Sequence, residues 1–200
     1  MMIIDQEKCI GQFREALNRY APVSEESLSK LLSIAKFTSI EKGHYLLQLN
    51  QVAKSLYFVC EGIITSLFVT QDGNTHIKNF FLEGNFAAST VSLLLSCPSS
   101  FALECLEDGI ILSLNFKKYK QLINENDDLK NFYTGYLEQK WVIENEKRQI
   151  SFATQTAMER YLTFLKNYTD LESRVPQRHI ASYLGITPTQ LSRIRKDLKK

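Results

Sequence analysis

The chain has 200 residues, of which 44% are hydrophobic and 23% charged, as in globular proteins with one large or two modest domains. No apolar run approaches the roughly 20 residues of a membrane-spanning helix, and the opening MMIIDQEKC lacks the features of a signal peptide. We therefore expect a cytoplasmic protein without a membrane partner. The four cysteines show irregular spacing without a C-x-x-C pair, which favours free thiols over a metal site: Cys9, Cys60, Cys97 and Cys105.

The net charge of +2 is unevenly distributed along the chain. From Arg174 to Lys200 there are seven basic residues and one acid, so this segment carries a charge near +6. Residues 1–173 carry a charge near −4. A basic tail is often only a solvated face, but this one also contains a motif, which favours an anionic partner.

Residues 6–37 show apolar side chains at helical spacing, broken by Pro22, with Ser24 as a predicted N-cap. From about residue 38 to 115, short runs rich in β-branched and aromatic residues alternate with turn signals. Asp72-Gly73 lies between two such runs and predicts a hairpin. The spacing of these strands predicts a β-sandwich or barrel-like roll.

After Lys117 the helical pattern returns, and four apolar residues recur at intervals of seven: Leu129, Tyr136, Ile143 and Ile150. A long helix with an apolar stripe needs a surface to lie against. That surface is either the chain's own domain or the same helix of a second copy. We favour the second copy, which makes these four residues the predicted dimer interface. A further helix is predicted over 157–168.

Residues 180–198, IASYLGITPTQLSRIRKDL, predict two short helices joined by a tight turn. Gly185 supplies the left-handed conformation that closes the first helix. Thr187 is a predicted N-cap of the second, and Gln190 three residues later completes a capping box. The apolar face of the second helix is predicted at Leu191, Ile194 and Leu198.

The remaining faces of the second helix carry hydroxyl, amide and guanidinium groups, which read base edges in the major groove of DNA. Lysine and arginine near its end are suited to phosphates. With the caps, the basic segment and the upstream helix, this predicts helix-turn-helix binding to double-stranded DNA. The predicted DNA-binding residues are Arg178, Thr187, Thr189, Gln190, Ser192, Arg193, Arg195, Lys196 and Lys199.

Nearly the whole chain resembles the Crp/Fnr-type transcription regulators, the superfamily of the cyclic-AMP receptor protein. Residues 56–86 resemble the family's nucleotide-binding roll, and 129–150 its dimerisation helix. Residues 189–193, TQLSR, are similar to the E-T-x-S-R of its recognition helix, with Thr189 in place of Glu. The resemblance implies an α+β fold with a sensor domain (1–126), a dimerisation helix (127–151) and a helix-turn-helix domain (152–200). It also implies a homodimer and, for an activator, contact with RNA polymerase.

The sensor part departs from the family pattern. Cyclic-nucleotide binders place a Glu on the ribose and an Arg-Ser pair on the phosphate, whereas here Ser89 and Ser99-Ser100 occupy those positions. Because the phosphate lacks its arginine, we expect no cyclic-AMP control of the usual kind. The pocket either holds a less anionic small molecule, or is closed by side chains such as Phe101, or takes a nucleotide through backbone amides and hydroxyls. No cofactor is identified, and the candidate pocket residues are Gly84, Ser89, Ser99, Ser100, Glu144 and Asn145.

Three further expectations follow from the sequence. Related proteins carry a β-hairpin wing after the recognition helix, whereas this sequence stops two residues after Leu198, so phosphate contacts are expected from the helix end itself. The resemblance also implies regulation through a hinge near residues 151–154. An enzyme is not expected, since the histidines do not form the His-x-His of a metal-dependent cupin. A ligand-binding or scaffolding module without specific DNA binding is the alternative function.

Overall fold

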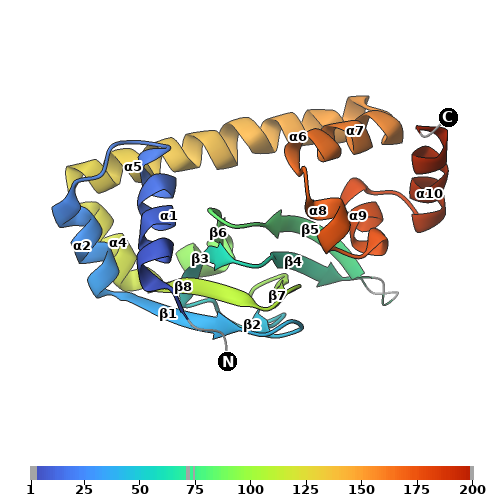
Figure 1. Ribbon diagram of the computed structural model, residues 1–200. Helices are drawn as coiled ribbons and strands as arrows, with labels where there is room; N and C mark the ends of the chain where they lie inside the picture. Colours follow the sequence, from blue (N-terminus) through green and yellow to red (C-terminus); the bar gives the residue numbers. More distant parts are fainter. Residues whose placement is uncertain (1–3, 71–72, 74, 199–200) are drawn as a thin grey trace.

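The computed structural model describes residues 4–70, 73 and 75–198. It is an α+β protein in which a β-roll lies beneath one long helix, and a group of short helices lies at the far end of that helix (Figure 1). Among the described residues, no helix is long and apolar enough to cross a membrane.

Two antiparallel four-stranded sheets form the roll, with strand orders β1-β8-β3-β6 and β2-β7-β4-β5. The strands are β1 (Ala35–Ile40), β2 (Tyr45–Leu47), β3 (Ser55–Glu61), β4 (Ile64–Val69), β5 (Thr75–Phe81), β6 (Phe86–Ala87), β7 (Ala102–Cys105) and β8 (Gly109–Asn115). The predicted hairpin is confirmed, because β4 pairs with β5 from Ile64↔Phe81 to Val69↔Thr75. Gly73 adopts a φ of 80°, the left-handed conformation that such turns require. Asp72 itself lies outside the described residues.

The N-terminal helices are α1 (Gln6–Asn18) and α2 (Glu25–Ser33). Ser24 caps α2 as predicted, because its Oγ accepts a hydrogen bond from the backbone N–H of Ser27 at 3.1 Å. The prediction of helix up to residue 37 is wrong, since Ala35–Phe37 begin β1 and pair with β8. Local apolar spacing gave no sign of this pairing with a strand about 75 positions later in the chain.

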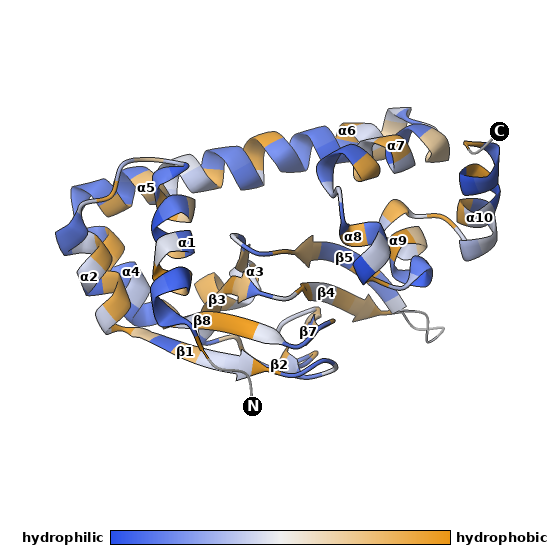
Figure 2. Ribbon diagram, in the orientation of Figure 1, coloured by the Kyte–Doolittle hydropathy of each residue, from blue (hydrophilic) through white to orange (hydrophobic). Residues whose placement is uncertain are grey.

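The long helix consists of α5 (Asp127–Leu137), a π-helical segment η1 (Glu138–Ile143) and α6 (Glu144–Thr154). It ends at Thr154, and the chain turns at Gln155, so the predicted hinge at 151–154 falls within its last helical turn. Figure 2 shows this helix as mostly hydrophilic with scattered hydrophobic residues. Further helices are α3 (Thr90–Leu95), α4 (Phe116–Glu125), α7 (Ala157–Asn167), α8 (Leu171–Arg174), α9 (Gln177–Leu184) and α10 (Pro188–Asp197).

Two hydrophobic cores hold the molecule together. The larger core lies between the sheets and beneath α1, α2, α4 and α5, with Phe13, Phe58 and Leu112 fully buried. The second core is shared: Ile77 and Phe80 of β5 pack in the same cluster as Ile180 of α9. The C-terminal helices are therefore anchored to the roll by apolar burial, the dominant stabilising contribution in folding.

Candidate nucleic-acid interface

The helix pair α9–α10 is built as its sequence predicts. Gly185 closes α9 with a φ of 69°, and the backbone N–H of Ile186 donates to the carbonyl of Ala181 at 3.0 Å. Ala181 is completely buried, so α9 and its neighbours approach closely there. Pro176 is the residue before the first turn of α9 rather than within it.

The capping box of α10 is confirmed. Thr187 Oγ1 accepts from the backbone N–H of Gln190 at 3.1 Å, while Gln190 Oε1 accepts from the backbone N–H of Thr187 at 3.0 Å. Gln190 therefore uses its amide oxygen on its own helix, which leaves only its amide nitrogen for a base. Leu191 is buried and Ile194 is half-buried, but Leu198 is 43% exposed, so its predicted place on the buried face is wrong.

Most of the predicted DNA-binding residues are exposed. The exposed side chains are Arg178, Thr187, Thr189, Gln190, Ser192, Arg193 and Lys196. Thr189, Arg193 and Lys196 lie at intervals of three and four, which places them on one face of α10. Lys199 lies outside the described residues.

Arg195 faces the other way. Its Nε lies 2.9 Å from a carboxylate oxygen of Glu172, and both side chains are about one quarter exposed (26% and 28%). Glu172 also accepts a hydrogen bond from the Tyr161 hydroxyl at 2.5 Å, and burial together with this carboxylate raises the pKa of Tyr161 to about 12. The prediction that Arg195 neutralises a DNA phosphate is therefore not supported by its position.

A second arginine of the basic segment is also paired within the chain. Arg174 Nη2 lies 2.6 Å from carboxylate oxygens of both Glu83 and Glu107, which belong to the roll. These contacts hold the pKa of Arg174 above its ordinary value. Two of the seven basic residues, Arg174 and Arg195, thus form ion pairs within the chain. The charge available to a partner comes from the exposed cations.

The predicted ligand pocket is brought together only in part. Ser89 and Ser99 are both 2% exposed, and the Ser99 hydroxyl donates to Ser89 Oγ at 2.8 Å or to the carbonyl of Phe101 at 2.7 Å. Ser100 is exposed, and Gly84 forms a turn with a φ of 78°. Glu144 and Asn145 are exposed on α6, and Glu144 accepts hydrogen bonds from Lys140 at 2.8 and 3.0 Å. The six residues therefore do not line one cavity.

Side chains fill the space beside the serine pair. Phe101 is 8% exposed and Leu103 is completely buried, as the closed-pocket alternative requires. The ammonium group of Lys78 lies 4.2 Å from the centre of the Phe101 ring. Arg148 of α6 donates to the side-chain oxygen of Asn79, the neighbour of Lys78 in β5, and no sequence motif marks either cation.

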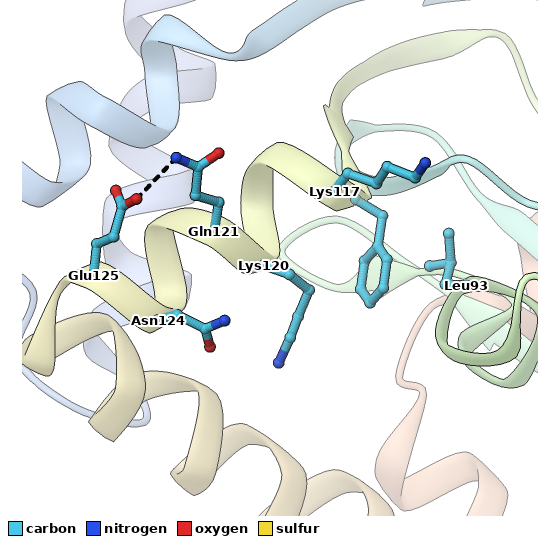
Figure 3. A pocket seen from close by; sticks show the side chains of 7 residues that line it. Leu93, Lys117, Lys120, Gln121, Asn124 and Glu125 are labelled. Atoms are coloured by element: carbon cyan, nitrogen blue, oxygen red, sulfur yellow. Dashed lines mark hydrogen bonds between the residues drawn. The ribbon is translucent and has the colours of Figure 1, made fainter.

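Two hollows occur elsewhere on the described surface. One, of about 520 Å³, follows α4, with Leu93 of α3 across from its polar side chains (Figure 3). Three of those polar side chains are already engaged: Lys120 Nζ lies 4.0 Å from the centre of the Tyr133 ring, and Gln121 donates to Glu125 at 2.8 Å. The other hollow, of about 230 Å³, is lined by Tyr45, Gln48, Leu49, Leu67, Phe68, Val69 and Ala102.

The predicted dimer residues divide into two groups. Leu129 is completely buried in the core of the roll, and Tyr136 packs against that core, with its ring centre 5.3 Å from that of Tyr20. These two positions are directed at the chain's own domain, which corrects their assignment to a dimer interface. Ile143 and Ile150 are 40% and 54% exposed, so they remain available to a partner.

Within the described part of the chain, no three histidine, cysteine, aspartate or glutamate side chains lie close enough to hold a metal ion. All four cysteines are free thiols, and three of them are buried: Cys9, Cys60 and Cys105.

Comparison with known proteins shows that the chain is similar to several transcription regulators. Residues 37–126 match the family model of the Cyclic nucleotide-binding domain. The Fumarate and nitrate reduction regulatory protein of Yersinia pestis is 25% identical over 187 residues, which cover 86% of this chain and 72% of the relative. The structure of FixK2 from Bradyrhizobium japonicum superposes with a TM-score of 0.68 at 22% identity, covering 83% of this chain and 85% of FixK2. The c-di-GMP responsive global regulator CLP of Xanthomonas campestris superposes with a TM-score of 0.68 at 16% identity, covering 88% of this chain and 92% of CLP.

Proposed function

We propose that the chain is a transcription regulator of the Crp/Fnr superfamily, and that it is a homodimer that binds a specific sequence of double-stranded DNA. The observation that carries the proposal is the exposed face of α10. Thr189, Arg193 and Lys196 share that face on a helix fixed at its start by a capping box and on its other side by Leu191.

The chemistry of this face suits the major groove. The guanidinium of Arg193 can donate two hydrogen bonds to the O6 and N7 of a guanine, the commonest base-specific contact in protein–DNA complexes. Thr189 and Ser192 offer hydroxyls, which donate to or accept from a base edge. Lys196 lies one turn nearer the helix end than Ser192, and Arg178 lies at the start of α9. Both supply positive charges that can contact DNA phosphates.

Dimerisation would set the distance between two such faces. Val142, Ile143 and Ile150 expose 58%, 40% and 54% of their surface along the part of the long helix that follows α5. Pairing of these residues with a second copy would bury an apolar stripe that is otherwise in contact with water. Two recognition helices about 34 Å apart would then enter successive major grooves of a near-palindromic site.

Control by cyclic AMP in the usual way is not part of the proposal, because Ser89 and Ser99 occupy the positions of the ribose and phosphate ligands and hydrogen-bond each other. The relative named as c-di-GMP responsive indicates that this fold accommodates other effectors. A cytoplasmic location and, for an activator, contact with RNA polymerase are further parts of the proposal.

Selection of binding sites from random duplex DNA, without added ligand and at one stated salt concentration, tests the proposal. A two-fold symmetric site is the expected result. On that site, Arg193→Ala is expected to lose about 1–3 kcal/mol of binding free energy and to relax the preference at one base position. Lys118→Ala, on an exposed position of α4 far along the chain, is the control and should bind as the unaltered protein does. If the unaltered protein and both variants bind all DNA sequences equally, the result would favour a ligand-binding or scaffolding module instead.

A further inference from the structure

The capping box at the start of α10 leaves one polar group of its two side chains without a partner. The backbone N–H and the hydroxyl of Thr187 both donate to Gln190 Oε1, at 3.0 and 3.3 Å. Thr187 Oγ1 in turn accepts from the backbone N–H of Gln190 at 3.1 Å. Within residues 4–70, 73 and 75–198, the side-chain nitrogen Nε2 of Gln190 has no hydrogen-bond partner. The hydroxyl and the amide oxygen are therefore in use, and the two N–H donors on Nε2 are free.

The chemistry of the box fixes the direction in which the Gln190 amide points. A half-turn of the amide would place its NH2 group against the backbone N–H of Thr187, so that donors would face each other. A glutamine that reads adenine uses both ends of its amide, because the oxygen accepts from N6 and the nitrogen donates to N7. Since the oxygen of Gln190 already accepts two hydrogen bonds, this exposed side chain offers donors only.

A second capping box in the same chain shows a different choice of residue. In α7, Glu159 takes the position that corresponds to Gln190, and its Oε2 accepts from the backbone N–H and the hydroxyl of Thr156, both at 2.8 Å. A carboxylate there stabilises a helix further, because its negative charge interacts favourably with the positive end of the helix dipole. At the start of α10 the amide lacks this charge but adds two donors, which indicates a partner that accepts hydrogen bonds.

We infer that Gln190 reads a keto base, guanine or thymine, beside the base contacted by Arg193. Gln190 lies three residues before Arg193 and about 60° around the helix, so the two side chains are neighbours on its surface. Residues near the start of a recognition helix contact base edges. Guanine O6 and thymine O4 accept hydrogen bonds in the major groove, whereas cytosine and adenine present amino groups there. This inference rests on the proposed function and names the bases that one of its residues selects.

The substitution Gln190→Glu tests the inference, because it keeps the cap and reverses the hydrogen bonding toward DNA. One carboxylate oxygen can replace Oε1, as in the box of Glu159, where both bonds to Thr156 use the same oxygen. The second oxygen then replaces Nε2 and only accepts, as a glutamate does from N4 of cytosine. Sites selected from random duplex DNA should change at one position of each half-site, from guanine or thymine to cytosine or adenine. The melting temperature should not fall, since the capping box is retained.

Two further variants separate base reading from capping and from charge. Gln190→Ala should weaken binding to the original site about 3- to 10-fold, the loss of one hydrogen bond, and should select the four bases about equally at that position. Gln177→Glu adds the same negative charge at an exposed position in the first turn of α9. It can weaken binding through repulsion of the phosphates, but its selected site should match that of the unaltered protein.

The outcomes distinguish this inference from the proposed function. If the unaltered protein selects a two-fold symmetric site and Gln190→Glu selects the same bases, Gln190 contacts a phosphate or serves only as a cap, and the inference is wrong. An adenine preference that disappears in Gln190→Ala would show that the amide turns over on DNA, which also contradicts it. If the unaltered protein selects no sequence at all, the proposed function fails and the inference fails with it.

Discussion

Arg195 and Glu172 form an ion pair, with Arg195 Nε 2.9 Å from the carboxylate, on the side of α10 that faces the chain's own α8. Lys196, the next residue, lies about 100° around the helix and is exposed. Two adjacent cations of the same helix therefore have different surroundings: one holds α10 to α8, and the other is available to a phosphate of the DNA.

This difference predicts different salt dependences of DNA binding. Lys196→Ala should reduce the slope of log K against log salt by about one per subunit, since each phosphate contact releases roughly one counterion. Arg195→Ala should leave that slope unchanged and instead lower the melting temperature of the protein. Titrations of one operator at several salt concentrations measure the slopes. A reduced slope for Arg195→Ala would show that the ion pair opens on DNA.

The contact of Glu83 with Arg174 predicts an acid-sensitive connection between the roll and the C-terminal helices. Burial alone would raise the pKa of Glu83, but hydrogen bonds from Arg174 and from the backbone N–H of Gly62 lower it below its ordinary 4.5. A lowered carboxyl pKa adds stability above the unfolded-state pKa, and this stability disappears as the pH falls through the folded-state value.

Glu83→Gln should therefore cost about 1–2 kcal/mol at neutral pH, a figure reduced for partial solvent exposure. Its melting temperature should also fall less than that of the unaltered protein between about pH 6 and pH 3. Melting curves across this range provide the measurement. Glu25→Gln, which removes an exposed surface pair with Arg14, should follow the unaltered protein throughout.

Replacement of Gly109 by alanine is expected to lower the stability of the protein strongly. A Cβ atom at this position would lie 2.1 Å from the carbonyl oxygen of Glu61, at the irregular end of the β3–β8 pairing. Because the neighbour is backbone, the sheet itself must shift, and Gly109→Ala should cost more than about 2 kcal/mol. Gly11→Ala is the matched control: it lies inside α1 with no atom within 4 Å of the added Cβ, and it should stabilise by about 0.5–1 kcal/mol. Denaturant unfolding of both variants decides the prediction.

The exposed part of the long helix predicts where the dimer can be broken. Ile150→Glu places a charge on the apolar stripe and should shift the protein from dimer to monomer at micromolar concentration, with weaker DNA binding as a result. Val52→Glu, which alters an apolar side chain of the roll with 41% exposure, should leave the dimer intact. Sedimentation velocity separates the two. A monomeric unaltered protein, or a dimeric Ile150→Glu variant, would contradict this interface.

Features encoded by neighbouring residues could be predicted from the sequence. The cap at Ser24, the turn at Gly185 and the box between Thr187 and Gln190 each depend on residues within a few positions of one another. The strands of the roll were predicted because alternating apolar residues and glycine turns mark them locally.

The remaining features depend on contacts between distant residues. Leu129 continues the seven-residue spacing of the dimer stripe, yet the roll covers it, and no spacing reveals which side of a helix its own domain occupies. Arg195 carries the same charge as Lys196, and only the fold brings Glu172 to it. Asn79 and Arg148 are 69 positions apart, so their hydrogen bond follows from the arrangement of β5 and α6.

The shared core of Ile77, Phe80 and Ile180 has a consequence for how this protein can change over generations. The helix pair that would read DNA takes part of its interior from a strand of the roll, so it is not a portable module. Transplanted onto another dimerising unit, it would carry an uncovered apolar surface and a strong tendency to aggregate. Substitutions in β5 must therefore be accepted or rejected together with those in α9, and the two halves of the chain evolve as one.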